Sequence, residues 1–169
     1  DELASAVLVT SCETMATAVQ QQLEVQVAQL RRESIARKSL EDYGAIILAT
    51  DLEEAIAFSN RIAPEHLELA VADPFAILPK IRHAGAIFMG HHTPEAAGDY
   101  LAGPNHTLPT GGTARFFSPL SVEDFVKKSS IVSFSKAGLE RLGHQIVHIA
   151  ELEGLQAHGR SVSLRLADS

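Results

Sequence analysis

The 169-residue chain is poor in the residues that mark secreted and membrane-embedded proteins. It contains a single cysteine, Cys12, so an internal disulfide is excluded and nothing indicates an oxidising compartment. Tryptophan is absent, and aromatic residues make up only 5% of the chain. No apolar run approaches the roughly 20 residues that a membrane-spanning helix needs, and the acidic N-terminus does not resemble a signal peptide. These absences predict a cytoplasmic protein that does not enter a membrane.

Positive charge is also scarce, because 14 Lys and Arg residues stand against 21 Asp and Glu residues, which gives a net charge of −7. Sequence-independent nucleic-acid binding draws mainly on clustered Lys and Arg, so a nucleic-acid partner is not expected. Apolar residues make up 46% of the chain, which is enough to build a core and excludes intrinsic disorder. The length fits one domain, or one domain with an appendage.

Short apolar runs alternate with helical patterns in the first half of the chain. The runs that predict strands cover residues 5–10, 44–50, 67–71 and 85–90. Strands that are apolar throughout and alternate with helices indicate a parallel sheet covered on both faces. We therefore expect an α/β fold, part of a doubly wound parallel sheet with about four βα units.

The first helical pattern follows Ser11, which is a candidate N-cap. Its apolar residues recur at spacings of three and four and predict one buried stripe: Met15, Val19, Leu23, Val27 and Leu30. A second helix is expected to end before Gly44, and Asp51, Glu53 and Glu54 place negative charge at the start of a third. Residues 73–81 predict a further short helix.

Residues 91–120 lack periodicity, apart from a brief helical stretch at 94–101, and are rich in glycine and proline. So long a connection within a compact domain is usually functional. Beyond it we expect a mainly helical tail, with helices at 121–128, 136–151 and 152–166 and a strand at 131–134. The organisation predicted is an α/β domain over 1–120, with its functional loop at 91–120, and a C-terminal tail over 121–169.

Glu65 and His66 form the first of three clusters that could carry chemistry. They lie side by side between a predicted helix and a predicted strand, and a carboxylate beside an imidazole suits general acid–base catalysis. The alternative is an exposed glutamate next to a histidine that hydrogen-bonds to backbone. Spacing alone favours that second interpretation.

The second cluster lies in the glycine- and proline-rich segment and contains His91, His92, Glu95, Asp99 and His106. Glu95 and Asp99 are one helical turn apart, so both can face the same way. Imidazole and carboxylate ligands suit zinc or another divalent ion. Adjacent histidines also occur as simple loop residues, and Asp99 could be a helix cap. The glycines and prolines that follow favour a backbone held in a fixed shape against a ligand.

The third cluster contains Glu153, Gly154 and His158 in the predicted tail. Glycine within a helix costs about 1 kcal/mol relative to alanine, which a close approach of another backbone or a ligand would explain. Alternatively, Gly154 simply breaks the helix. The residues alone indicate an α/β domain with a ligand-binding loop and a potential metal site, and they name no substrate.

Three segments together resemble the histidinol dehydrogenase family. They are NRIAPEHLEL at 60–69, AGAIFMGHHTPEAAGDYLAGPNHTLPTGGTARF at 84–116 and IAELEGLQAHGRSVSLRL at 149–166. The resemblance extends over essentially the whole chain, but it covers only the C-terminal part of the family's usual length. It implies a zinc-dependent enzyme that oxidises L-histidinol to L-histidine in two NAD-linked steps through an aldehyde.

The resemblance also implies roles for individual residues. By analogy, Glu65 activates water for the aldehyde step, and His66 accepts the proton of the alcohol and contacts substrate. Asp99 and His158 match zinc ligands that also face the substrate.

Two further residues match substrate-binding positions of the family. Glu153 matches a carboxylate that binds the ammonium group of the substrate, and His106 is expected beside the substrate. The family forms an intertwined homodimer, so the resemblance implies that the tail brings Glu153 and His158 to the partner's site in trans.

The family pattern contains parts that this chain lacks. Two more zinc ligands, a glutamine and a histidine three residues later, would precede Asp1, and the NAD-binding lobe would lie there too. We therefore expect no NAD-binding residue in this chain and no activity from the chain alone. Two alternatives stay open: a naturally short binding or assembly module that keeps the fold, and a metal-assisted hydrolase with Glu65 as its base.

Overall fold

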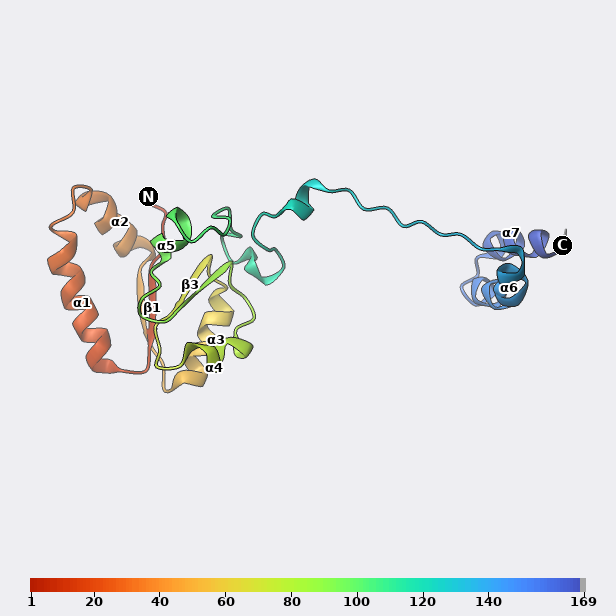
Figure 1. Cartoon of the computed structure of the whole chain (residues 1–169). Coiled ribbons are helices and arrows are strands. Elements are labelled where there is room, and N and C mark those ends of the chain that lie inside the picture. Colours follow the sequence, from red (N-terminus) through yellow and green to blue (C-terminus); the bar gives the residue numbers. More distant parts are fainter. Residues whose placement is uncertain (168–169) are drawn as a thin grey trace. The chain divides into compact units, whose positions relative to one another are not determined.

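The computed structural model describes residues 1–167, which separate into two compact units (Figure 1). The first unit runs from Asp1 to Phe125 and the second begins at Val126, a few residues beyond the predicted domain boundary. Among the described residues, no helix has the length and apolar character that crossing a membrane would require.

The first unit alternates strands and helices, which confirms the α/β class. Its main elements are β1 (Val7–Thr10), α1 (Glu13–Val27), α2 (Glu33–Tyr43), β2 (Ala45–Leu48), α3 (Leu52–Ile62), β3 (His66–Leu69), α4 (Pro74–Ile77), β4 (Ala86–Met89) and α5 (Glu95–Tyr100). Single 3-10 turns cover Leu78–Lys80, Thr113–Arg115 and Val122–Phe125. The last of these replaces the α-helix predicted at 121–128, and a short α4 followed by a 3-10 turn replaces the one predicted at 73–81.

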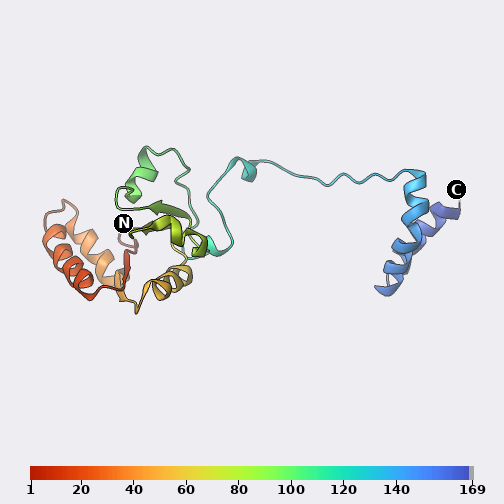
Figure 2. The ribbon, with the colours of Figure 1, turned by 60° about the horizontal axis from the view of Figure 1, so that its bottom comes forward.

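All four predicted strands of the first unit are present, and they form two parallel pairs (Figure 2). β1 pairs with β2, and β3 pairs with β4 so that His66 lies opposite Ala86 and Leu69 opposite Met89. Over the described residues the strands therefore make two two-stranded sheets, and the expected continuous four-stranded layer is wrong. Each strand has only four residues. Such short ladders offer few hydrogen bonds to join one pair to the other.

The hydrophobic core of the first unit lies between α3 and the β3–β4 pair. Ile56 of α3, Leu69 of β3 and Ile77 of α4 are buried together. Partly buried apolar residues surround them: Leu67, Val71, Ile81, Ile87 and Met89. The burial of these side chains is what fixes β3, and with it the start of the strand where His66 lies.

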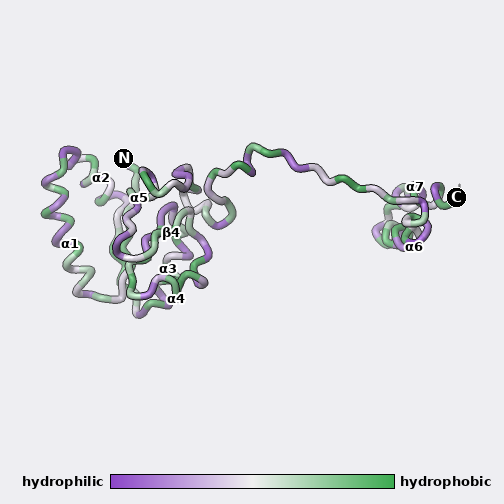
Figure 3. The backbone as a smooth tube through the Cα atoms, viewed as in Figure 1, coloured by the Kyte–Doolittle hydropathy of each residue, from purple (hydrophilic) through white to green (hydrophobic). Residues whose placement is uncertain are grey.

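α1 is only partly covered. Hydrophobic and hydrophilic residues alternate along its turns (Figure 3), yet of the predicted stripe only Val27 is fully buried. Met15 is 52% exposed and Leu30, beyond the end of the helix, is 51% exposed, so the buried-stripe prediction is wrong for these two. A two-stranded pair is too narrow to cover a 15-residue helix. The predicted N-cap is also wrong, because Cys12 occupies that position without a side-chain hydrogen bond.

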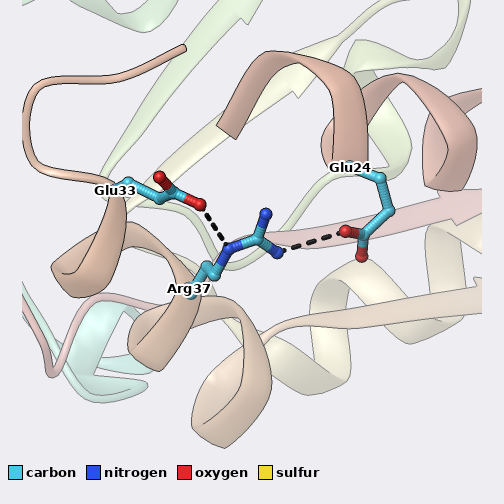
Figure 4. A network of polar contacts seen from close by, with 3 residues as sticks. All are labelled: Glu24, Glu33 and Arg37. Carbon is cyan, nitrogen blue, oxygen red and sulfur yellow. Dashed lines mark hydrogen bonds and ion pairs between the residues drawn. The ribbon is translucent and has the colours of Figure 1, made fainter. Parts of the chain in front are cut away.

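A polar network joins α1 to α2 (Figure 4). The Arg37 guanidinium donates to Glu33 at 2.8 Å and to Glu24 at 3.1 Å. Glu33 lies one turn away on α2, whereas Glu24 belongs to α1. The Arg37–Glu24 ion pair therefore links the two helices, while the Arg37–Glu33 pair lies within α2.

The second unit is a helical hairpin of α6 (Lys136–Leu152) and α7 (Gln156–Ala167). Gly154 has a φ of +74°, a left-handed conformation that ends α6, so the helix-breaking interpretation of this glycine is confirmed. Gly143 lets the helices approach closely, because a Cβ there would lie 2.7 Å from Leu166 Cδ1. Residues 131–134 form no strand with any described segment, which makes that prediction wrong. An apolar run needs a partner strand to become a ladder.

Candidate active site and metal centre

His66 is the first residue of β3, and its ring is half-buried against Phe88 of β4. The two ring centroids are 5.9 Å apart with an interplanar angle of 41°. The Nε2 atom is buried and has no hydrogen-bond partner among the described residues. A buried imidazole nitrogen without a partner is costly, so this atom is available to a ligand.

The turn before β3 determines the position of His66 at the start of that strand. Ala63 ends α3 in the left-handed region, with a φ of 52°, and is completely buried. The Glu65 carbonyl then accepts a hydrogen bond from the Ala86 N–H at 2.8 Å. Gly85 allows this approach, because a Cβ there would lie 2.5 Å from the Glu65 oxygen. These contacts fix the backbone of Glu65, which directly precedes His66. The side chain of Glu65 is partly exposed.

α5 docks on the β3–β4 pair through two contacts. The Glu95 N–H donates to the carboxylate of Glu68 on β3 at 2.7 Å. Gly98 lies against Phe88, and a Cβ at this glycine would be 2.7 Å from Phe88 Cε1. A glycine is thus required where the helix touches the ring, and this contact brings the two carboxylates of α5 to His66.

Three potential ligand atoms meet here. His66 Nε2 lies 3.6 Å from Glu95 Oε1 and 3.9 Å from Asp99 Oδ1. The three atoms all fall within 4.8 Å of one another. Neither distance from Nε2 is a hydrogen bond. One nitrogen and two oxygen donors with such spacing fit a divalent cation, and this fit is the chemical property that distinguishes the cluster.

The electrostatics of the cluster follow from its two neighbouring carboxyl groups. Burial and a hydrogen bond with Asp99 raise the pKa of Glu95, and the negative charge of Asp99 adds to the increase. The proximity of His66 acts in the opposite direction. A site of this kind favours a positive charge between the carboxyl groups.

The loop that carries His106 is closed by its own hydrogen bonds. The Asn105 carboxamide donates to the Leu120 carbonyl at 2.7 Å and accepts from the Thr107 N–H at 2.8 Å. The Leu120 N–H donates to the Thr107 carbonyl at 3.0 Å. His106 itself is exposed. The backbone around it is fixed, as the glycine and proline content predicts.

Arg115 fastens the far side of the same loop. Its guanidinium donates to the Gly112 carbonyl at 2.7 Å and also to the carbonyl of Arg61, in the last turn of α3. The loop and the helix that precedes the Glu65–His66 turn are therefore linked directly.

Glu153 and His158 belong to the second unit. Glu153 is the C-cap of α6, and His158 lies in the first turn of α7, where its N–H donates to the Leu155 carbonyl at 3.0 Å. Both are exposed. The cluster in the first unit therefore joins His66 to Asp99, and the pairing of Asp99 with His158 stays a prediction.

Glu95 is the member of the cluster that the family resemblance did not assign. The spacing of Glu95 from Asp99 in the sequence predicts that Glu95 could be a metal ligand. The sequence also offers His91 and His92 as metal ligands, and both lie exposed after β4. The approach of both carboxylates to His66 depends on how α5 docks, which no local pattern encodes.

An imidazole and two carboxylates thus lie together beside one strand of a parallel α/β unit. This arrangement is typical of an α/β protein with a potential site for metal-assisted chemistry. Comparison with known proteins makes this specific: residues 1–166 match the family model for histidinol dehydrogenase. The chain belongs to the histidinol dehydrogenase family.

Its relatives carry the same name. The chain is 72% identical over its full length to a histidinol dehydrogenase of Syntrophotalea carbinolica, and 74% identical over 98% of its length to one of Geobacter sulfurreducens. It covers 39% of each of these proteins. The crystal structure of histidinol dehydrogenase from Elizabethkingia anophelis is similar with a TM-score of 0.86 at 42% identity, over 96% of this chain and 37% of that one. The chain thus spans about two fifths of the length of the relatives it matches.

Proposed function

We propose that this chain is part of a zinc-requiring, NAD-dependent histidinol dehydrogenase that oxidises L-histidinol to L-histidine through the aldehyde. Family membership supports the reaction. The observation that carries the proposal is the meeting of His66 with Asp99, because two residues expected to act on one substrate lie together.

His66 and Glu65 divide the proton transfers. His66 presents a buried Nε2 without a partner, which suits it to accept the proton of the substrate alcohol. Glu65 precedes it and is partly exposed, which suits a base that activates water for the aldehyde step. A carboxylate and an imidazole on one turn can serve two successive proton transfers.

Asp99 and His158 would hold the zinc ion, with the remaining ligands supplied from outside this chain. Bound zinc would orient the imidazole and amine nitrogens of the substrate. Glu153 would bind the substrate ammonium group and His106 would lie beside the substrate. In a homodimer, the hairpin that carries Glu153 and His158 would act in the partner's site.

NAD would bind outside this chain and supply the hydride chemistry, while the residues described here position the substrate and move protons. We therefore expect the chain alone to be inactive, because Asp99 and His158 are an incomplete set of zinc ligands and NAD would bind elsewhere. Supplying the missing part separates the proposal from an assembly module, because a module would stay inactive even then.

A hybrid enzyme tests the proposal. The segment of the Geobacter sulfurreducens relative that aligns with this chain is replaced by this chain, and NADH formation is measured with L-histidinol. We expect the hybrid to be active and the 169-residue chain alone to be inactive. His66→Ala in the hybrid should lower kcat by about 10²- to 10⁴-fold, as expected for loss of a general base.

His144→Ala is the matched control, because it removes an exposed histidine of α6 that belongs to none of the candidate clusters. A folded hybrid that forms no NADH, or one in which His66→Ala is as active as the parent, would show that the proposal is wrong.

A further inference from the structure

We propose that His66, Glu95 and Asp99 form a divalent-cation site that is complete within the first unit. This donor set differs from the zinc ligands implied by family resemblance, since it shares only Asp99 with them and needs no residue of the α6–α7 hairpin. The inference does not rest on the proposed function.

The geometry of the three atoms is close to that of a bound ion. Two ligand atoms of a tetrahedral zinc site lie about 3.4 Å apart, given zinc–ligand distances of about 2.0 to 2.2 Å. His66 Nε2 is 3.6 Å from Glu95 Oε1 and 3.9 Å from Asp99 Oδ1. Small rotations of the two carboxylate side chains would bring all three atoms into the first coordination sphere.

The site is built by the fold as well as by its three side chains. Its nitrogen donor is a buried Nε2 that has no hydrogen-bond partner among the described residues. The Gly98–Phe88 contact holds both carboxylates of α5 toward that nitrogen. The Glu95 side chain is 40% exposed and the Asp99 side chain 33%, so an ion can enter with some of its water.

The chemistry of the donors selects the kind of ion. An imidazole with two carboxylates suits Zn²⁺, Co²⁺ or Mn²⁺, whereas Ca²⁺ and Mg²⁺ prefer oxygen ligands alone. Two carboxylates also balance the charge of a divalent ion. Three protein ligands leave at least one position for water or another incoming ligand.

A cation at this site occupies His66 Nε2, the atom that the proposed reaction needs as a proton acceptor. The two uses of His66 therefore exclude each other. An ion held by His66, Glu95 and Asp99 would therefore block that proton transfer for as long as it is bound.

The test is a cobalt titration of the 169-residue chain, followed by its visible absorption and by competition with Zn²⁺. We expect one tight Co²⁺ per chain. Glu95→Gln should weaken binding about tenfold or more, since it removes a ligand and not merely an outer-shell contact. Asp99→Asn should do the same. His158→Ala should leave the affinity unchanged.

Glu41→Gln is the matched control, because it removes an exposed carboxylate from a helix of the same unit. Binding that is lost in His158→Ala but kept in Glu95→Gln would overturn the inference, and so would a parent chain that takes up no Co²⁺. If either of these two results is obtained while the hybrid enzyme is active, the cation site is wrong and the proposed function is still supported. Normal Co²⁺ binding with an inactive hybrid would contradict the proposed function alone.

Discussion

The two strand pairs of the first unit differ in how far they are covered. The β3–β4 pair packs on α3 and α4 around Ile56, Leu69 and Ile77. On the β1–β2 pair, by contrast, Leu48 is 53% exposed, and α1 leaves Met15 open. The β3–β4 pair therefore has a cluster of buried apolar side chains packed against it, although Phe75 of α4 and Tyr100 of α5 are exposed in the same half.

The difference teaches that the candidate site lies in the half with the buried core. The contacts described for His66, Glu95 and Asp99 come from β3, β4, α5 and the turn that precedes β3. The chain spans about two fifths of the length of its relatives, and apolar surface such as that of Leu48 is where we expect the rest of such a protein to pack.

Truncating one apolar side chain in each half, one buried and one exposed, tests the comparison most strongly. Ile56→Ala removes a side chain that is 7% exposed and should lower the free energy of unfolding by about 2 to 5 kcal/mol. Leu48→Ala should change it by less than about 0.5 kcal/mol in the isolated chain. Urea unfolding followed by circular dichroism measures both. Equal losses for the two variants would contradict the comparison, and a larger Leu48→Ala loss in the hybrid enzyme would sharpen it.

Asn60 provides a second test, because its carboxamide joins α3 to the segment before β4. It accepts from the N–H groups of Arg82 and His83 and donates to the Lys80 carbonyl at 2.9 Å. Asn60→Ala should cost about 1 to 2 kcal/mol, and the loss should be insensitive to salt. Arg37→Gln in the other half removes exposed ion pairs, so its smaller effect should shrink in 1 M NaCl, roughly a 3 Å screening length. A salt-dependent Asn60 effect would argue against this distinction.

The smallest expected effect on stability comes from the side chains at the N-terminal ends of the helices. Asp51 caps α3 and Glu54 accepts hydrogen bonds from the Thr50 N–H and hydroxyl, whereas α1 and α2 begin without a side-chain cap. The hydrogen bonds from Thr50 lower the pKa of Glu54 below its usual value of 4.5. Its contribution to stability is therefore present above the unfolded pKa and is lost as pH falls through the folded pKa.

Urea unfolding at a series of acidic pH values checks this point. The stability difference between the parent and Glu54→Gln should narrow as pH falls below the usual glutamate range. Glu13→Gln, in the uncapped first turn of α1, is the control. The same narrowing in the control would mean that the cap of α3 is not responsible.

Local sequence patterns predict where the strands and helices of this chain form better than they predict which strands pair with one another. The apolar runs at 5–10 and 85–90 become β1 and β4, and the negative charge predicted at the start of the third helix lies there, with Asp51 as the N-cap of α3. The run at 131–134 is also apolar, with the β-branched residues Ile131 and Val132, but it forms no strand, because a ladder depends on a second segment far away in the sequence. The pairing into two sheets is non-local for the same reason.

The candidate site shows the same limit. Spacing identifies Glu95 and Asp99 as two carboxylates on one helical face, and adjacency identifies Glu65 with His66. Their meeting requires Gly98 to lie on Phe88, a contact between a helix and a strand that neither segment encodes by itself. The roles of His106, Glu153 and His158 come from family resemblance and stay predictions.

The turn at Gly154 has a consequence for how the hairpin could serve another copy of the chain. Glu153 closes α6 and His158 opens α7, and the Leu155 N–H ties the turn back to the Ala150 carbonyl at 2.8 Å. The backbones of the two residues are thus parts of one short rigid corner. An exchanged hairpin would deliver both side chains in a single docking event, so each subunit of a dimer would gain or lose the pair together.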